Sequence, residues 1–121
     1  MKLKLKRVYE APAAADGFRI LVDRLWPRGL SKEAAHVDLW LKDAAPSAEL
    51  RKWFNHEPDK WPPFQARYLE ELRQDPGKTA PIREQAGKGT VTLVYGAKDE
   101  EHNQALVLKE FLAKGGSHPH A

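Results

Sequence analysis

The stretch Phe18-Arg19-Ile20-Leu21-Val22 decides how this chain folds. It is short, mostly apolar and rich in β-branched residues, as is typical of a buried strand in a parallel sheet. A second strong strand pattern is Thr90-Val91-Thr92-Leu93-Val94-Tyr95. Helical patterns separate the strand-like segments, and this alternation predicts an α/β fold: a single domain over residues 1–114, with a mostly parallel sheet and flanking helices. Residues 115–121 are predicted to form a flexible tail. The order of the strands stays open.

Outward from these strands, residues 2–9 alternate lysine with leucine. A period of two predicts a half-buried strand, and a row of lysines on its open face is typical of an edge strand protected from pairing with another chain. The alternative is a functional basic patch.

Helices are predicted from capping residues and from apolar side chains at helical spacing. Pro46-Ser47 reads as the start of one helix, and the stripe Trp61, Phe64, Tyr68 and Leu72 marks the clearest amphipathic helix. The remaining expected elements are a short turn capped by Ser31, an extended piece over 37–41, a helix over 79–86, and a last helix capped by Asp99.

Composition limits the classes of function that this chain can have. A length of 121 residues fits one domain, and 41% hydrophobic residues argue against disorder. The chain has no cysteine, which excludes disulfides, thiol nucleophiles and cysteine-based metal sites. No apolar run approaches the roughly 18 residues of a membrane span, and the basic N-terminus is not a signal peptide, so we expect a cytoplasmic protein without membrane contact.

Two segments are expected beyond the carboxyl ends of the strands, where parallel sheets bind ligands. They are residues 23–32 and 95–103. Arg24 and Arg28 are candidates to hold a carboxylate or phosphate through paired hydrogen bonds. The further candidate ligand contacts are Trp26, Ser31, Lys32, Tyr95 and Asn103.

Three residues of the same segments are candidates for acid–base chemistry. His102 titrates near neutral pH, and Asp23 and Asp99 could orient the arginines or act as bases. The alternative is structural: Asp23 and Arg24 would form ion pairs within the loop, and Asp99 would only cap a helix. Whether the protein is an enzyme stays open.

Longer motifs resemble a known family. The chain is similar to the YeaO-like branch of domain-of-unknown-function family 488 from about Lys4 to Leu112. The resemblance implies a small bacterial or archaeal α/β protein without an established activity. In other branches a cysteine and a His-Arg pair follow the last strand, whereas this chain has Tyr95-Gly96 and His102-Asn103, so thiol chemistry is not carried over. The segments that carry the resemblance to this family are residues 23–29, 40–47, 50–54, 64–72 and 93–103.

These patterns favour binding of an anionic or phosphorylated small molecule. A protein-interaction module without catalysis is the alternative, and a nucleic-acid-binding module comes third, because a net charge of +3 from 20 basic and 17 acidic residues is too even to indicate nucleic acid. No cofactor or metal is predicted: His36-x-Asp38 and His56-x-x-Asp59 each lack a third partner. The oligomeric state stays open.

Overall fold

The computed structural model describes residues 2–114 and contains one sheet of four parallel strands. The strand order is β1-β4-β2-β3, so the predicted parallel α/β architecture is confirmed. The predicted tail, residues 115–121, lies outside the described residues. The strands are β1 (Leu3–Arg7), β2 (Phe18–Leu21), β3 (Leu39–Trp40) and β4 (Val91–Tyr95); the helices are α1 (Lys32–Ala35), α2 (Ala48–Phe54), α3 (Trp61–Gln74), α4 (Ala80–Ala86) and α5 (Gln104–Ala113).

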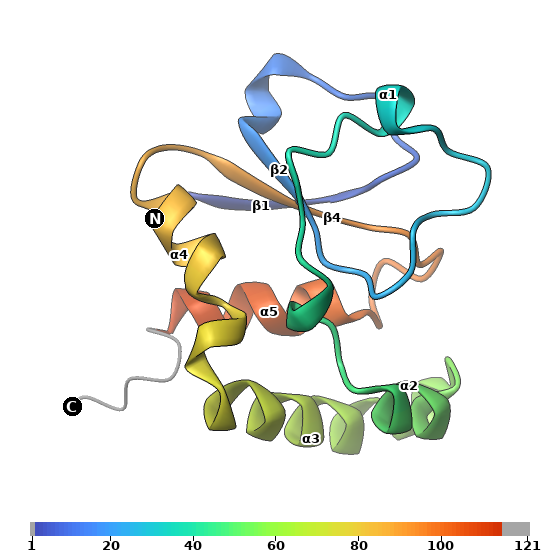
Figure 1. The fold of residues 1–121 in the computed structure, drawn as a ribbon. Helices are drawn as coiled ribbons and strands as arrows, with labels where there is room; N and C mark the ends of the chain where they lie inside the picture. Colours follow the sequence, from blue (N-terminus) through green and yellow to red (C-terminus); the bar gives the residue numbers. More distant parts are fainter. Residues whose placement is uncertain (1, 115–121) are drawn as a thin grey trace.

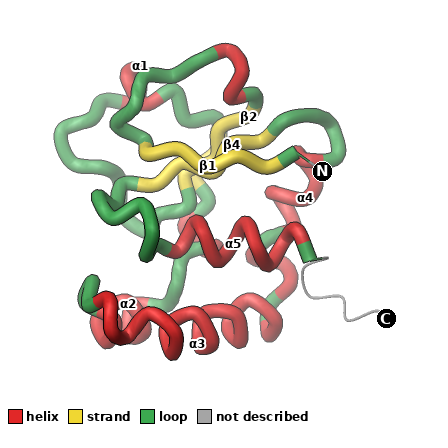
Figure 2. The backbone as a smooth tube through the Cα atoms, turned by 180° about the vertical axis from the view of Figure 1, so that it is seen from behind, coloured by secondary structure: helices red, strands yellow, loops and turns green. Residues whose placement is uncertain are grey.

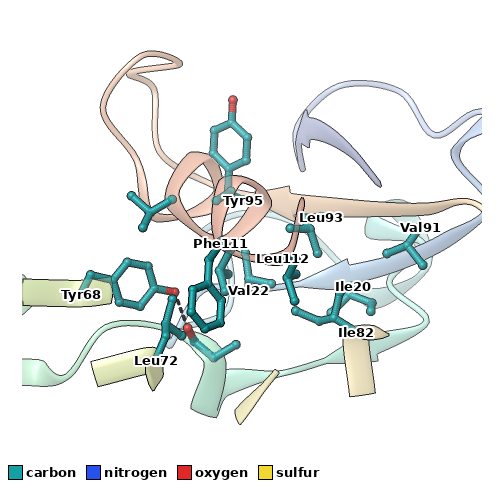
Figure 3. Packing of buried hydrophobic residues seen from close by; sticks show 14 of the residues in the cluster. Ile20, Val22, Tyr68, Leu72, Ile82, Val91, Leu93, Tyr95, Phe111 and Leu112 are labelled. Atoms are coloured by element: carbon teal, nitrogen blue, oxygen red, sulfur yellow. Dashed lines mark hydrogen bonds between the residues drawn. The ribbon is translucent and has the colours of Figure 1, made fainter. Parts of the chain in front are cut away.

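The strand register divides the side chains between two faces of the sheet. Leu5 of β1 lies beside Leu93 of β4, which lies beside Ile20 of β2. These three side chains belong to the main core, which α2 to α5 complete. Figures 1 and 2 place α5 between the sheet and the layer formed by α2 and α3. Figure 3 shows this core from close by, with the hydroxyl of Tyr68 bonded to the backbone carbonyl of Ala44 (dashed line).

The opposite face of the sheet is covered by loops and the short helix α1 (Figure 1). Leu21 and Val94 are fully buried there and form a smaller cluster with Val8 and Ala35. The half-buried Trp26 packs against this cluster. Residues 23–38 therefore cover this face of the sheet, with Ala35 in the small cluster and Trp26 packed against it.

The edge position predicted for the lysine-rich strand is confirmed, since β1 lies at one end of the strand order. Two lysines of this strand form polar contacts within the chain. Lys4 donates to the Ala15 carbonyl at 2.9 Å, and Lys6 forms an ion pair with Asp16 at 3.1 Å. The basic face of β1 therefore anchors the turn that follows the strand.

Asp16 and Arg19 form a buried ion pair that the apolar pattern of the β2 segment does not reveal. Nη1 of Arg19 lies 2.6 Å from Oδ2 of Asp16, and both residues are buried. The other guanidinium nitrogens donate to the carbonyls of Ala35 and His36. Because every donor nitrogen has a partner, the charge of Arg19 is held inside the loop layer without an unsatisfied group.

Two predicted helix starts are confirmed and one is wrong. Ser31 and Ser47 cap α1 and α2, each accepting from a backbone N–H three residues on. The last helix begins at Gln104 and is capped by Asn103, whose side chain accepts from the N–H of Leu106, and not by Asp99. Asp99 instead accepts hydrogen bonds within the preceding turn, which delays the helix by four residues.

Candidate functional site

The carboxyl ends of β2 and β4 adjoin one another, and the chain leaves them toward opposite faces of the sheet. After β2 the chain continues to α1 and the outer strand β3, whereas after β4 it turns to α5 on the helical face (Figure 1). Such a divergence opens a crevice beyond the strand ends, which is where open α/β sheets bind ligands.

Asp23 joins the two loops at this crevice. Its Oδ2 accepts a hydrogen bond of 2.8 Å from the backbone N–H of Gly96, and its Oδ1 accepts one from the side-chain amide of Gln104. A Cβ at position 96 would lie 3.0 Å from Oδ2, so glycine permits this close approach. Burial raises the pKa of Asp23, against the lowering effects of the two hydrogen bonds and the Arg51 charge.

A hollow of about 430 Å³ lies over these loops. Arg24 and Arg28 contribute to its wall from the loop after β2, and Arg51 contributes from α2. The Nε atoms of Arg24 and Arg51 are buried and have no hydrogen-bond partner within residues 2–114. The hollow is lined by Asp23, Arg24, Leu25, Trp26, Pro27, Arg28, Ala45, Pro46, Arg51, His56, Gly96, Ala97 and Gln104.

A second hollow, of about 290 Å³, adjoins the first and shares Pro46, Arg51, His56, Ala97 and Gln104 with it. Its other lining residues are Lys52, Phe54, Asn55, Phe64, His102 and Asn103. The two hollows together form one site, which we call the arginine crevice.

His102 and Asp99 form a pair beside the second hollow. Nδ1 of His102 lies 2.8 Å from Oδ2 of Asp99, and the imidazole ring meets the ring of Trp61 edge-on at 5.3 Å. Hydrogen bonds from the N–H of Glu101 and from His102 lower the pKa of Asp99. Neither Asp99 nor His102 hydrogen-bonds to Asp23; Asp23 lines the first hollow, His102 lines the second, and Asp99 lines neither.

Some of the predicted ligand contacts line the crevice and others do not. Arg24, Trp26 and Arg28 line the first hollow. The indole N–H of Trp26 donates to the Leu30 carbonyl at 2.6 Å, and its ring meets that of Trp40 edge-on at 5.3 Å, so this side chain also supports the loop.

Ser31 and Lys32 lie at the start of α1, outside the set of residues that lines either hollow of the crevice. The hydroxyl of Ser31 accepts from the N–H of Ala34, as its role as a helix cap requires. The prediction that Ser31 and Lys32 join the arginines around one anion is therefore not supported by their positions.

Asn103 and Tyr95 are tied into the fold. Asn103 lines the second hollow, but its Oδ1 caps α5 and its Nδ2 donates to the carbonyl of Asp99 at 2.9 Å. Tyr95 belongs to the main core, and burial raises its pKa. In Figure 3 its hydroxyl points away from the other labelled side chains.

Arg51, His56 and Gln104 were not among the predicted site residues. Arg51 stands near the middle of α2, where a charged residue is ordinarily a solvated one. His56 follows the αL cap Asn55 and itself has a positive φ of 55°, a conformation that few non-glycine residues adopt and one that no residue type reliably signals. Arg51 and His56 reach the hollow that Asp23 lines from α2 and the residues after it, and Gln104 reaches Asp23 from the start of α5.

Two classes of feature are absent from the part of the chain that the structure describes. No three His, Asp or Glu side chains there gather as they would around a metal ion. Over the same residues, no helix has the length and apolar character needed to cross a membrane.

Comparison with known proteins gives a family but no activity. Residues 2–118 match the model of a family described as the inactive N3 subclade of domain-of-unknown-function family 488. The uncharacterized protein YeaO of Escherichia coli K12 is 44% identical over 112 residues, which cover 93% of this chain and 97% of YeaO. An uncharacterized protein of Mycobacterium tuberculosis H37Rv is 40% identical over 111 residues, which cover 92% and 93% of the two chains. No solved structure matches.

Proposed function

The chain belongs to domain-of-unknown-function family 488, and from this premise we propose that it binds an anionic or phosphorylated small molecule in the arginine crevice without converting it. The subclade's description as inactive favours binding over catalysis. A catalytic role for Asp23, Asp99 or His102 stays a prediction of the sequence.

One observation carries the proposal. The Nε atoms of Arg24 and Arg51 are buried without a partner among the described residues, and both side chains line the same hollow. A buried donor without a hydrogen bond is destabilising by about 1–3 kcal/mol, more when it is charged. A ligand with carboxylate or phosphate oxygens would bind the guanidinium groups that these two side chains bring to the hollow, through short, charge-assisted hydrogen bonds.

The charges around the crevice agree with this ligand class. Arg24, Arg28, Arg51 and Lys52 line it, and among the described lining residues Asp23 is the only acidic one. The Asp23 carboxylate is occupied by Gly96 and Gln104, so it holds the loops while the arginines remain for the ligand.

The two alternative functions have less support. A nucleic-acid module would use the lysine face of β1, but Lys4 and Lys6 are bonded to Ala15 and Asp16. A protein-interaction module would need an extended apolar surface. Among the described residues, the exposed large hydrophobic side chains are Leu25 and Tyr9, with 70% and 43% of their surfaces accessible.

Thermal unfolding with a series of anions tests the proposal. Phosphate, pyrophosphate, sulfate and citrate are compared with chloride at constant ionic strength, using the native protein and the variants Arg24→Met, Arg51→Met and Arg73→Met. A ligand at a hundred times its Kd adds about 2.7 kcal/mol, which raises Tm by several degrees. We expect such a rise with at least one multivalent anion.

The variants identify the site. Arg73 forms an exposed ion pair with Glu70 and lies outside the crevice, so Arg73→Met removes the same charge without touching the hollow. The anion effect should persist in Arg73→Met and shrink in the two crevice variants. Equal anion effects in all four proteins would mean that the anions stabilise the protein only by screening its positive charge, which would contradict the proposal.

A further inference from the structure

The second hollow of the arginine crevice differs in chemistry from the first. The first is walled by arginines, whereas the second is floored by aromatic rings. Phe54 and Phe64 line it and stack with ring centroids 4.4 Å apart, and Trp61, which is outside the lining, stacks on Phe64 at 5.5 Å. An aromatic floor of this kind favours a flat ring, because ring faces and edges attract one another beyond their apolar burial.

Two histidine rings stand at this hollow. His56 lies against Phe54, with ring centroids 6.2 Å apart, and His102 meets Trp61 edge-on. Asn55 and His56 both have positive φ values, 47° and 55°. Non-glycine residues held in this region are uncommon and gather at ligand sites, and here the two residues line the hollow directly.

Hydrogen-bond acceptors line the same hollow. Nε2 of Gln104 donates to Asp23, and Nδ1 of His102 faces the Asp99 carboxylate. Within the described residues this leaves Oε1 of Gln104 and Nε2 of His102 without a partner. In a neutral imidazole whose Nδ1–H is held by a carboxylate, Nε2 is an acceptor. Both atoms would therefore select a ring that carries N–H groups.

We infer that the arginine crevice takes a two-part ligand of the nucleoside monophosphate class: its phosphate lies among the arginines, and its heteroaromatic ring lies in the second hollow. The inference rests on the proposed function and specifies its ligand. The shared wall of Arg51, His56 and Gln104 makes the two hollows continuous, as one molecule with an anionic end and a ring requires.

Calorimetric titration with ribose 5-phosphate and with adenosine 5′-monophosphate separates the two parts, because only the second compound carries a ring. Both titrations are made at the same pH and ionic strength, so that the phosphate carries the same charge in each. We expect adenosine monophosphate to bind about tenfold to 100-fold more tightly, the range that stacking one base supplies.

The variant His56→Asn removes the ring but keeps a residue that tolerates left-handed backbone. It should lower this ratio of affinities; because His56 also lines the first hollow, the ratio and not the Kd of ribose 5-phosphate alone is the readout. His36→Asn is the matched control, because His36 also has a positive φ, 50°, and lies outside both hollows. His102→Phe is the second test: it keeps a ring against Trp61 and removes the acceptor, so it too should lower the ratio.

Equal affinities for the two compounds in the native protein would overturn the ring site and leave the anion site standing. A ratio unchanged in both His56→Asn and His102→Phe would overturn it as well. If neither phosphate compound binds, this inference is overturned, whereas the proposed function is decided separately by the anion series and its arginine variants.

Discussion

The backbone N–H of Gly96 donates a 2.8 Å hydrogen bond to the carboxylate of Asp23, and this bond joins the ends of two neighbouring parallel strands. The residues are 73 positions apart in the chain. Gln104 binds the other oxygen of the same carboxylate, so Asp23 holds the loop after β2, the loop after β4 and the start of α5 together. This one side chain therefore joins three of the segments that line the arginine crevice.

Replacing Asp23 by asparagine should remove a pH dependence of stability. Burial raises the pKa of Asp23 above its ordinary value of 3.8, so the folded state holds this proton more tightly than the unfolded state. The contribution of Asp23 to the free energy of unfolding is then fully present below pH 3.8 and is lost as pH rises through the folded pKa.

Urea unfolding of the native protein and Asp23→Asn at several pH values checks this sign. The native protein should be more stable relative to the variant at pH 4 than at pH 7, while the other carboxyl groups cancel in the difference. Asp23→Ala, which leaves the Gly96 N–H without its acceptor, should lose about 1–3 kcal/mol at either pH. A relative stability that increases with pH would show that the pKa of Asp23 is lowered.

Gly96→Ala should weaken the same junction. The added Cβ would lie 3.0 Å from Oδ2 of Asp23, so the carboxylate has to shift and the hydrogen bond lengthens. We expect a loss of about 1 kcal/mol in the free energy of unfolding, the usual net contribution of one hydrogen bond. Gly89→Ala is the control, since nothing lies within 4 Å of a Cβ there. Equal stability changes in the two variants would argue against close contact at Gly96.

Asp16→Asn should be among the more destabilising single substitutions in this chain. It leaves the buried Arg19 charge without its partner at 2.6 Å, and breaking a buried pair from one side costs about 3–5 kcal/mol. Glu70→Gln breaks an exposed pair with Arg73 instead and should cost under about 1 kcal/mol. Chemical denaturation of both variants at pH 7 makes the comparison, and similar losses would mean that Arg19 is solvated.

The same ion pair should contribute to acid unfolding. Burial raises the pKa of Asp16, but hydrogen bonds from Ala13, Lys6 and Arg19 together lower it below its ordinary value of 3.8. This contribution to stability is present above pH 3.8 and is lost as pH falls through the folded pKa. The stability difference between the native protein and Asp16→Asn should therefore shrink below pH 4. A difference that stays constant to pH 2 would contradict it.

Asn103→Ala should destabilise the start of α5. Loss of an N-cap side chain costs about 1 kcal/mol, and Asn103 also donates to the carbonyl of Asp99. Asp99→Ala removes bonds within an exposed turn and should cost less. Thermal unfolding of both variants ranks their losses of stability. A larger loss for Asp99→Ala would indicate that Asp99, and not Asn103, is the important cap of α5.

Local patterns in the sequence determined the elements of the fold. Apolar runs without alternation predicted β2 and β4, and serine caps predicted the starts of α1 and α2. These signals act over a few residues, through backbone hydrogen bonds and side-chain spacing, so they can be read from the chain alone. The wrong prediction of Asp99 as the cap of α5 also has a local cause. In the turn before α5 the Asp99 carboxylate accepts backbone N–H hydrogen bonds, as the side chain of a helix cap does.

Only the tertiary structure decided the strand order and the composition of the crevice. β4 lies between β1 and β2, and this strand order brings Asp23 to Gly96 and Gln104. The position of α2 brings Arg51 to the same hollow. The sequence placed Arg24 and Arg28 near this edge but also assigned Ser31 and Lys32 to it, since proximity in the chain was the only guide. Contacts between residues tens of positions apart depend on the packing of whole elements, and a single chain carries no local pattern that records them.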